Sequence, residues 1–373
     1  MTSLRSSLAL ALEHPWRSLA IIACVLIAGG LAVAASGVVP LKASAGHWRI
    51  TNWLLHFTME RSVSTHAIPI DAPPLDDPAL IRRGATHYDL GCSPCHGNVD
   101  RATPRIPQAM LPPPPPLPDR VTRWQPEELF YIVKHGVKFT GMPAWPAQQR
   151  DDEVWAVVAF LRRLPELDAE DYRRLAGGQS VELSQLTDGS QELEPRIVRD
   201  NCARCHGLDG NETGDGAFPI LAGQRAEYMD QALRAYAEGR RYSGIMGPIA
   251  ASLNSGGLGE AVRHYASIGV AAAPTGNISE SSLRGERIAR SGIDATMIPP
   301  CVECHGPAES PKNAAYPRLA GQRADYLAAQ LHLLKRRQRG GSQYVELMHE
   351  FVDRLTDEQI ADVTAYFASL SER

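Results

Sequence analysis

The sequence has little excess charge of either sign and no short repeating period. Lys and Arg number 38 against 42 Asp and Glu, which gives a net charge of −4. Nucleic-acid-binding proteins normally carry a basic excess, so this balance argues against that class. The lack of a period excludes a collagen-like or coiled-coil chain. Hydrophobic residues make up 44% of the chain, which is too much for a disordered protein.

Motifs of common enzyme classes are also missing. The sequence has no Gly-rich nucleotide-binding loop after a strand, no Walker motif and no nucleophile constellation. A chain of 373 residues is long enough for two or three domains, at roughly 150 residues each. We therefore expect several folded domains that are not an enzyme of these kinds.

Charge is absent from one long segment near the N-terminus. Residues 19–41 form an apolar run of 23 residues, long enough as a helix to cross a hydrocarbon core of ~30 Å. Arg5 and Arg17 precede it, which places the N-terminus in the cytoplasm and exports the remainder. The alternative is a signal peptide cleaved near Ala32-Val33-Ala34. We favour an uncleaved anchor, because the run is longer than the apolar region of most signal peptides.

The segment that follows, residues 47–63, mixes large apolar and polar side chains. Trp48, Trp53, Leu54 and Phe57 lie among polar residues. Because Trp is favoured at the membrane–water interface, one interpretation is a helix lying in that interface. The other, equally supported, is a short helix packed on the first domain.

Six of the seven cysteines form three copies of the pattern C-x-x-C-H, each followed by glycine. This pattern is typical of c-type haem attachment. Two thiols one turn apart can each add to a vinyl group of the porphyrin, and the adjacent His reaches the iron from the same turn. Zinc would need four ligands per site, and a thiol oxidoreductase would need neither the His nor three copies. The residues are Cys92, Cys95 and His96; Cys202, Cys205 and His206; and Cys301, Cys304 and His305.

With these motifs the chain resembles the class I cytochromes c over about residues 78–373. The resemblance implies small helical domains, each with a haem motif near its start and a methionine later as the second axial ligand. We expect an all-α fold: an N-terminal transmembrane helix followed by three small class I cytochrome c domains with three covalently bound haem c groups. The expected divisions are 1–77 for the anchor and interfacial helix, then 78–176, 191–272 and 281–373.

The second and third domains repeat each other. Residues 218–228 (FPILAGQRAEY) match residues 316–326 (YPRLAGQRADY) at an offset of 98, which is similar to tandem di-haem class I cytochromes. The first domain lacks this segment. Its residues 136–145 (GVKFTGMPAW) resemble single-haem domains of cbb-type oxidase subunits and cytochrome subunits of some dehydrogenases. Small, polar or Pro/Gly-rich stretches at 177–190 and 271–280 suit domain junctions.

Each domain should close with an amphipathic helix. Apolar residues recur at helical spacing within 154–161 and 360–370, and Thr356 with Gln359 predicts a capping box. In the second domain Ser255-Gly256-Gly257 interrupts the pattern, so that helix is expected to begin later or to be weaker.

The closing helix also selects the candidate axial methionines. Met142 and Met348 precede an aromatic residue of that helix by 18 positions and Met246 by 19, and all three lie 40–46 residues after their motif His. Met110, Met229 and Met297 fit this register less well. The candidate ligands are therefore Met142, Met246 and Met348, with His135 and His349 as rivals.

In the resembling family a proline carbonyl accepts the Nδ1–H of the haem histidine and fixes its tautomer. Pro219 and Pro317 lie 13 and 12 residues after their histidines and fit this role. In the first domain the candidate lies within the run Pro112–Pro116, which we expect to be an extended polyproline stretch at the haem edge or a rigid solvent loop.

Histidine and methionine together leave no open position on the iron, and a Met ligand raises the potential. We therefore expect outer-sphere electron transfer by a single-pass inner-membrane protein whose haem domains face the periplasm, with membrane lipid but no nucleic acid as a partner. The expected redox partner is a membrane-bound terminal oxidase. The alternative is a periplasmic dehydrogenase, such as an alcohol or aldehyde dehydrogenase, that donates electrons to this chain. A third interpretation, a haem sensor or peroxidase, requires one haem without its methionine ligand. An unchanged spectrum after replacement of Met246 would indicate it. A basic cluster at residues 335–339 either meets an acidic partner or lipid headgroups, or is a solvated helix face.

Overall fold

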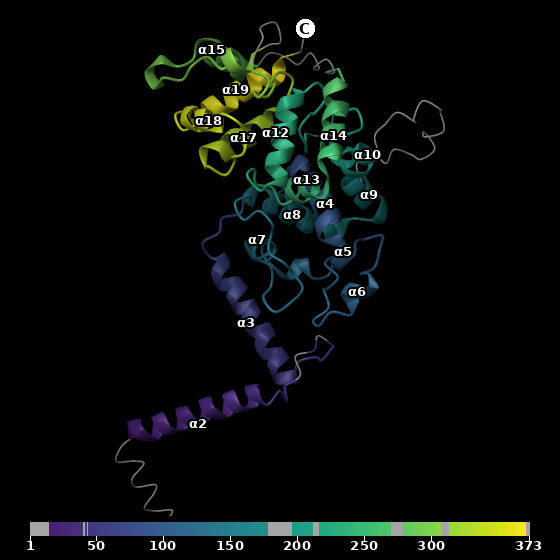
Figure 1. Cartoon of the computed structure of the whole chain (residues 1–373), viewed down its shortest axis with the longest axis vertical. Coiled ribbons are helices and arrows are strands. Elements are labelled where there is room, and N and C mark those ends of the chain that lie inside the picture. The colour runs from purple at the N-terminus through teal and green to yellow at the C-terminus, as the bar shows by residue number, and fades with distance from the viewer. Residues whose placement is uncertain are drawn as a thin grey trace, which may run out of the picture.

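A computed structural model of the chain describes residues 15–39, 42, 44–177, 196–211, 216–269, 279–306 and 313–370. Within these ranges the structure is helical, with one isolated bridge between Ile293 and Ile298 and no sheet. The prediction of an all-α fold is confirmed. Figure 1 shows α2 (Pro15–Ala35) apart at one end, α3 (Arg49–Ala67) leading away from it, and a helical body beyond.

The body contains three helical units, which we name by their described residues. Unit one is 78–177, unit two is 196–269 and unit three is 279–370, each with buried apolar clusters. The predicted linkers at 177–190 and 271–280 lie almost wholly outside the described residues, so the domain boundaries stay a prediction. Unit one contains α4 (Pro78–Gly91), α5 (Ser93–His96), α6 (Arg105–Gln108), η1 (Val121–Arg123), α7 (Pro126–His135), α8 (Asp151–Arg163), η2 (Leu164–Glu166) and α9 (Ala169–Gly177). Unit two contains α10 (Arg196–Asn201), α11 (Ala203–His206), α12 (Ala226–Ala237), α13 (Met246–Ser252) and α14 (Ser255–Ser267). Unit three contains α15 (Glu280–Ser291), η5 (Asp294–Thr296), α16 (Val302–His305), α17 (Ala324–Lys335), α18 (Val345–Val352) and α19 (Asp357–Ser369).

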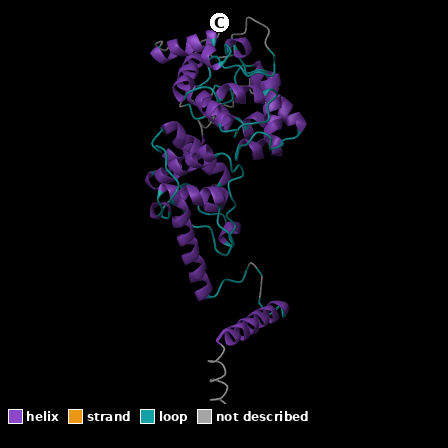
Figure 2. Ribbon diagram, turned by 90° about the vertical axis from the view of Figure 1, so that its left-hand side faces the viewer, coloured by secondary structure: helices purple, strands orange, loops and turns teal. Residues whose placement is uncertain are grey.

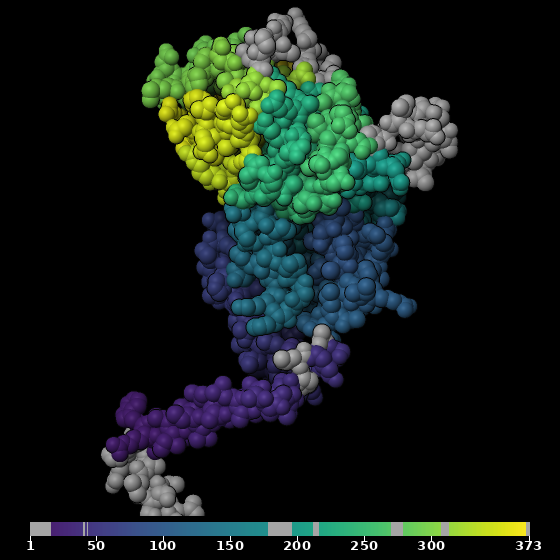
Figure 3. Space-filling model, in the orientation of Figure 1, coloured from purple at the N-terminus to yellow at the C-terminus, as the bar shows by residue number. Residues whose placement is uncertain are grey.

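The units are stacked along the long axis of the molecule. Unit one lies between α3 and the other two units, and units two and three lie side by side at the end far from α2 (Figures 1, 2 and 3). The stacking places unit two in contact with both of its neighbours.

Helix α2 packs against nothing within the described residues. It is the one described helix that is long and apolar enough to cross a membrane, and none of that span is buried. Its 21 residues extend about 30 Å, the thickness of a hydrocarbon core. An isolated apolar helix of this kind is stable only where its side chains leave water.

Helix α3 has two halves with different surroundings. Near its start Trp48 and Trp53 are exposed, and Trp53 stacks on Phe57 with ring centroids 5.6 Å apart. Near its end the helix packs on α7 of unit one: Ser64 Oγ donates to Glu128 at 2.7 Å, and the His66 ring stacks on Tyr131. The packed interpretation therefore holds for the second half, and the exposed first half keeps the interfacial interpretation.

Glycine fixes how the first helix of unit one crosses α8 and how the first helix of unit three crosses α19. A Cβ added to Gly84 of α4 would lie 1.8 Å from the carbonyl oxygen of Ala156 in α8. A Cβ on Gly285 of α15 would lie 1.9 Å from the carbonyl oxygen of Asp362 in α19. Only glycine lets the backbones approach this closely. The two crossings therefore depend on glycines at equivalent positions of units one and three, Gly84 and Gly285.

The closing helices form as predicted in units one and three. Val154, Val157 and Val158 are buried in α8, and the predicted capping box of Thr356 and Gln359 starts α19. In unit two the expectation of a late or weak helix was wrong. Helix α14 begins at Ser255, because Asn254 caps it by accepting from the Gly257 amide at 2.8 Å. Gly257 in turn makes room for Ile197 of α10, which would lie 2.6 Å from an added Cβ.

Candidate haem sites

Each C-x-x-C-H motif forms one short helical turn. The amide of each motif histidine donates to the carbonyl of the first cysteine, at 2.9 Å for His96, 3.0 Å for His206 and 2.9 Å for His305. The turn places both thiols and the imidazole on one short element, as the predicted attachment of haem requires. Within the described residues no three His, Cys, Asp or Glu side chains gather into a metal site, so the zinc alternative has no support there.

The two thiols of the motif in unit two are not of the reactive kind. Burial raises the pKa of Cys202 to about 11 and that of Cys205 to about 12. Disulfide-exchange cysteines have a depressed pKa and an electropositive setting. The alternative of a thiol oxidoreductase therefore finds no support in unit two.

A proline carbonyl faces the Nδ1 atom of every motif histidine. The distances are 2.9 Å from His96 to Pro115, 3.1 Å from His206 to Pro219 and 3.0 Å from His305 to Pro317. The structure thus contains the hydrogen bonds expected of Pro219 and Pro317 and selects Pro115 from the proline run, a choice that the sequence left open.

The hydrogen bonds also define the chemical form of the histidines. Burial lowers the pKa of His96, His206 and His305, and the bond to the proline carbonyl opposes this only in part. A neutral imidazole that donates from Nδ1 keeps the lone pair of Nε2 for a metal. Each of the three rings therefore leaves its Nε2 lone pair available to a metal.

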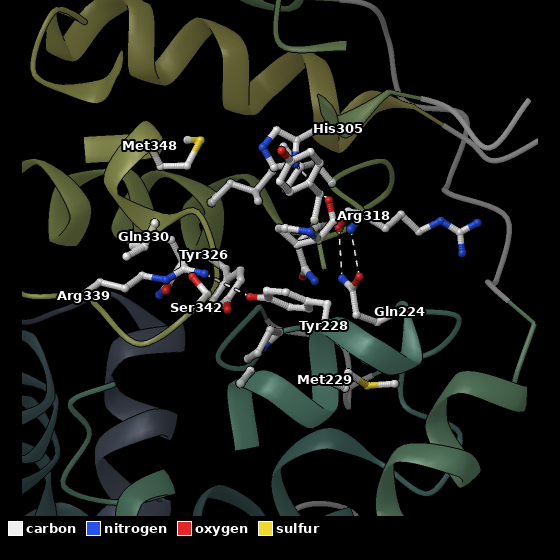
Figure 4. Close-up of a pocket in the computed structure, with 18 of the residues that line it drawn as sticks. Gln224, Tyr228, Met229, His305, Arg318, Tyr326, Gln330, Arg339, Ser342 and Met348 are labelled. Atoms are coloured by element: carbon white, nitrogen blue, oxygen red, sulfur yellow. Dashed lines mark hydrogen bonds between the residues drawn. The ribbon is translucent and has the colours of Figure 1, made fainter. Parts of the chain in front are cut away.

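Units two and three share one cavity. It is lined by the motif histidines and predicted methionines of both units, His206 and Met246 with His305 and Met348. Met246 begins α13. Met348 lies on α18, and Figure 4 shows it on the same side of the cavity as His305. The two predicted sites are thus neighbours inside one apolar space.

Unit two presents a second methionine to this cavity. Met229 lies on α12, as its helical surroundings predicted, and is buried in the core of the unit. In unit one, Met142 lies in the loop after α7, where its carbonyl accepts from the Val137 amide at 3.2 Å. The Met110 sulfur lies 3.0 Å from where a Cβ on Gly141 would be, so this methionine is also close to that loop.

The two rival histidines are occupied or exposed. His349 is buried, with Nε2 2.9 Å from the Arg339 carbonyl oxygen and Nδ1 3.3 Å from Glu346. His135 is exposed and packs its ring on Tyr131, with centroids 4.7 Å apart. Neither side chain lines the shared cavity.

The repeated segments of units two and three meet each other across the interface. Gln224 Nε2 donates to the Arg318 carbonyl at 3.0 Å, and its Oε1 accepts from the Arg318 amide at 2.8 Å. Gln322 does the same to Ile220, at 2.9 and 3.0 Å. Both glutamines are buried, and each occupies the same position of its repeat. The exchange, drawn in part in Figure 4, fixes the two sites relative to each other.

Two arginines at the same offset of 98 enter the cavity between the sites. Arg241 is buried and contacts the hydroxyl of Tyr228 at 3.3 Å, and Arg339 contacts the same hydroxyl at 3.0 Å. Within the described residues the ionisable groups that interact most strongly with Arg241 are tyrosines and not carboxylates, and the Arg339 Nε has no hydrogen-bond partner. Burial alone would raise the pKa of Tyr228, but the two arginine charges lower it to about 8.

This arrangement fits haem c. Buried guanidinium groups without an anion are costly, and each haem brings two carboxylate side chains. The cavity is otherwise lined mainly by apolar side chains, which suits a porphyrin ring. Arg241 and Arg339, which both line the cavity, would pair with those carboxylates.

Several of these residues escaped the sequence analysis. The repeat contained Gln224 and Gln322, but nothing in one sequence says that the repeated segments face each other. Arg241 and Arg339 stand at the offset of the repeat and could have been found by extending it. Pro115 could not be separated from the other prolines of its run.

The chain is similar in sequence to known c-type cytochromes. The family described as "Cytochrome c" matches residues 195–262 and 296–371, and "Cytochrome C oxidase, cbb3-type, subunit III" matches residues 79–161. The chain is 34% identical over 180 residues to the thiosulfate dehydrogenase electron acceptor of Stutzerimonas stutzeri, covering 46% of this chain and 80% of that protein. It is 31% identical over 197 residues to cytochrome c4 of Thiocapsa roseopersicina, covering 50% of this chain and 100% of that protein. A solved structure of cytochrome c4 from Acidithiobacillus ferrooxidans is 31% identical and covers 46% of this chain and 99% of that chain, with a TM-score of 0.41.

These relatives are matched over most of their own length, and both units that carry the repeat match the same family. The resemblance drawn from the motifs is therefore confirmed. The chain belongs to the cytochrome c family: it is a class I c-type cytochrome with tandem domains, an electron-transfer protein rather than an enzyme, and it binds haem c covalently.

Proposed function

We propose that this chain is a membrane-anchored periplasmic cytochrome with three haem c groups, which passes electrons towards a terminal oxidase. The observation that carries the proposal is the threefold occurrence of one ligand arrangement. In each unit a motif turn ends in a histidine whose Nδ1 lies 2.9–3.1 Å from a proline carbonyl oxygen. Three equivalent arrangements support three haems.

The residues of each unit have separate roles in this proposal. The paired cysteines would hold the porphyrin, and the motif histidine, through Nε2, would bind the iron together with Met142, Met246 or Met348. Haem c bound in this way supplies an iron that changes between Fe(II) and Fe(III) by one electron. With a histidine and a methionine bound, Fe(II) would be favoured and no ligand position would remain for oxygen or substrate.

The N-terminal helices support a membrane anchor. Helix α2 has the length and the exposed apolar surface of a transmembrane helix, and Arg17 at its start favours a cytoplasmic N-terminus. The exposed Trp48 and Trp53 at the start of α3 would lie at the periplasmic interface. Unit one would then be closest to the membrane, with units two and three farther away.

The match of unit one to an oxidase subunit family supports a terminal oxidase as the redox partner. A second candidate is a role as the acceptor of electrons from a periplasmic dehydrogenase. It is favoured by the relatives of Stutzerimonas stutzeri and Thiomonas intermedia, which are named thiosulfate dehydrogenase electron acceptors. Both candidates use the same three sites and differ in the partner.

The haem number and the partner need separate experiments. The mass of the intact holoprotein should correspond to three covalent haems, and the double variant Cys301→Ala, Cys304→Ala should lose one. A mass that corresponds to two haems in the unaltered protein would refute the count. Purification from the native membrane in mild detergent should bring copper and a- or b-type haem with the chain. Recovery of flavin, quinone or molybdenum cofactor instead would favour the dehydrogenase and refute the oxidase assignment.

A further inference from the structure

A buried carboxylate joins unit one to unit two. Glu153 lies in the first turn of α8 and is 3% exposed. Its Oε1 accepts from Ser243 Oγ at 2.6 Å, and its Oε2 accepts from the Gly244 amide at 2.6 Å, both in unit two. Within unit one, Trp145 Nε1 donates to Oε2 at 3.1 Å and Arg150 pairs with Oε1 at 3.0 Å. One side chain thus binds four donors from two units.

The partners of Glu153 in unit two belong to the loop that ends at Met246. While Ser243 Oγ donates to Glu153, it accepts from the Met246 amide at 3.0 Å. A continuous path of two hydrogen bonds therefore runs from the carboxylate of unit one to the backbone of the predicted ligand in unit two. Gly244 packs flat on the indole, since an added Cβ would lie 2.3 Å from Trp145 Nε1.

Further contacts fix the same loop on unit one. Arg150 Nη1 donates to the Tyr242 carbonyl at 2.8 Å, and Tyr242 and Ile245 pack against the buried core of unit one. The loop therefore takes its conformation from unit one on both sides of Gly244.

Unit one also contacts the motif edge of the second site. Asp89, three residues before the motif of unit one, pairs with Arg204 inside the motif of unit two at 2.6 Å. Ala79 of α4 packs with Cys205 and Phe218 in one buried cluster. The motif and the methionine loop of unit two are therefore both held by unit one.

A related contact recurs one unit farther along. Arg240 of unit two donates Nη1 to the Gly341 carbonyl of unit three at 2.9 Å, in the loop that leads to α18 and Met348. Each methionine loop beyond unit one is thus bonded to the preceding unit.

We infer that unit one is a structural part of the second haem site, with Glu153 as the positioning residue that holds the Met246 loop across the interface. The inference rests on the proposed function, in which Met246 binds the second iron. It follows that the first and second sites form a fixed pair, as the second and third sites do. Unit two is then the relay between the unit nearest the membrane and the unit farthest from it.

The test uses the full-length holoprotein with Glu153→Ala and, as the conservative change, Glu153→Gln. Two quantities are measured: hydrogen exchange of the Gly244 and Met246 amides, and the NMR signal of the Met246 methyl group in the reduced protein, assigned by its loss in Met246→Leu. Glu153→Ala should speed exchange of the Gly244 amide by about tenfold or more, because that amide loses its acceptor. It should also lower the potential of the second haem as the sulfur ligand loosens. Glu153→Gln should give a smaller change in the same direction.

The matched control is Asp362→Asn. Asp362 is also a carboxylate of a closing helix that is 3% exposed, but its partners Arg284 and Ser281 belong to its own unit. The Asp362→Asn variant should leave the exchange rate of the Gly244 amide and the potential of the second haem unchanged. Should Glu153→Ala fail to accumulate, Ser243→Ala removes the acceptor of the Met246 amide instead. It should speed exchange of the Met246 amide and lower the second potential, while the Gly244 amide keeps its bond to Glu153.

Two failures can be told apart. If the unaltered protein shows no iron-bound Met246, the ligand assignment of the proposed function is wrong, and exchange of the Gly244 amide still tests the positioning. If Met246 is bound but neither the exchange nor the potential moves in Glu153→Ala and Ser243→Ala, the inference about unit one is wrong while the proposed function stands.

Discussion

The reciprocal glutamines predict a symmetric effect on stability. Each of Gln224 and Gln322 makes two hydrogen bonds to a backbone amide and carbonyl of the other unit, over distances of 2.8–3.0 Å. A neutral hydrogen bond contributes about 0.5–1.5 kcal/mol, so Gln224→Ala and Gln322→Ala should each lower the free energy of unfolding by about 2 kcal/mol. Because the side chains are 8% and 7% exposed, the unpaired backbone groups are poorly reached by water. The two losses should therefore be nearly equal.

The assay is guanidinium unfolding of the holoprotein, followed by the haem absorption of units two and three. The exposed Gln149→Ala in unit one is the control and should change the free energy of unfolding by less than about 0.5 kcal/mol. The double variant should lose about 4 kcal/mol if the two pairs act independently. If one single variant is neutral and the other accounts for the entire loss, the exchange seen in the structure does not hold the units together.

Three further predictions follow from single side chains. Met246→Leu should remove methionine ligation at one of three haems and lower the potential of that haem. Met229→Leu is a volume-conserving change in the core, so it should keep ligation and lower the free energy of unfolding by under about 1.5 kcal/mol. Absorption spectra and redox titration check both variants, and the reverse outcome would make Met229 the ligand. Gly84→Ala should lower the free energy of unfolding of unit one by about 2 kcal/mol or more, because the added Cβ would meet the Ala156 carbonyl. Gly91→Ala, at the open end of α4, is the control and should not lower it. Equal thermal midpoints of the two variants would contradict the crossing geometry. Burial holds the pKa of His87 at about 3, below its ordinary 6.5, so only the unfolded state takes up this proton. Stability should fall as the pH drops below about 6.5, with about 2 kcal/mol lost by pH 5, and His87→Gln should flatten this dependence in unfolding measured between pH 7 and 5.

The local features of the sites could be read from the sequence because the haem motif and the helix period act over short distances. The motif turns need only five consecutive residues, and the hydrogen bonds of Pro219 and Pro317 span 13 and 12 residues. The all-α fold and the capping of α19 follow from the same local rules. The axial roles of Met142, Met246 and Met348 stay a prediction.

Features that depend on packing between distant segments were not readable. Glu153 and Ser243 are 90 residues apart, and neither differs in type from a surface residue. Helix α14 was misjudged because glycine lowers intrinsic helix propensity, yet Gly257 is where α10 crosses and Asn254 supplies the cap. The choice of Pro115 depends on how the segment that contains α6 folds back on His96 from 19 positions away, which composition does not determine.

The glutamine exchange between units two and three has a consequence for assembly. Gln224 of unit two bonds the backbone of unit three, and the equivalent Gln322 of unit three bonds the equivalent backbone position of unit two. A surface that makes such reciprocal contacts is complementary to itself, which is the property of the interface in two-fold homodimers. The tether between the units makes this contact independent of protein concentration. A fragment that lost unit three would expose the surface around Gln224, and two such fragments could bind each other through it. Proteolysis between these units would thus replace an internal contact by an association between molecules that depends on protein concentration.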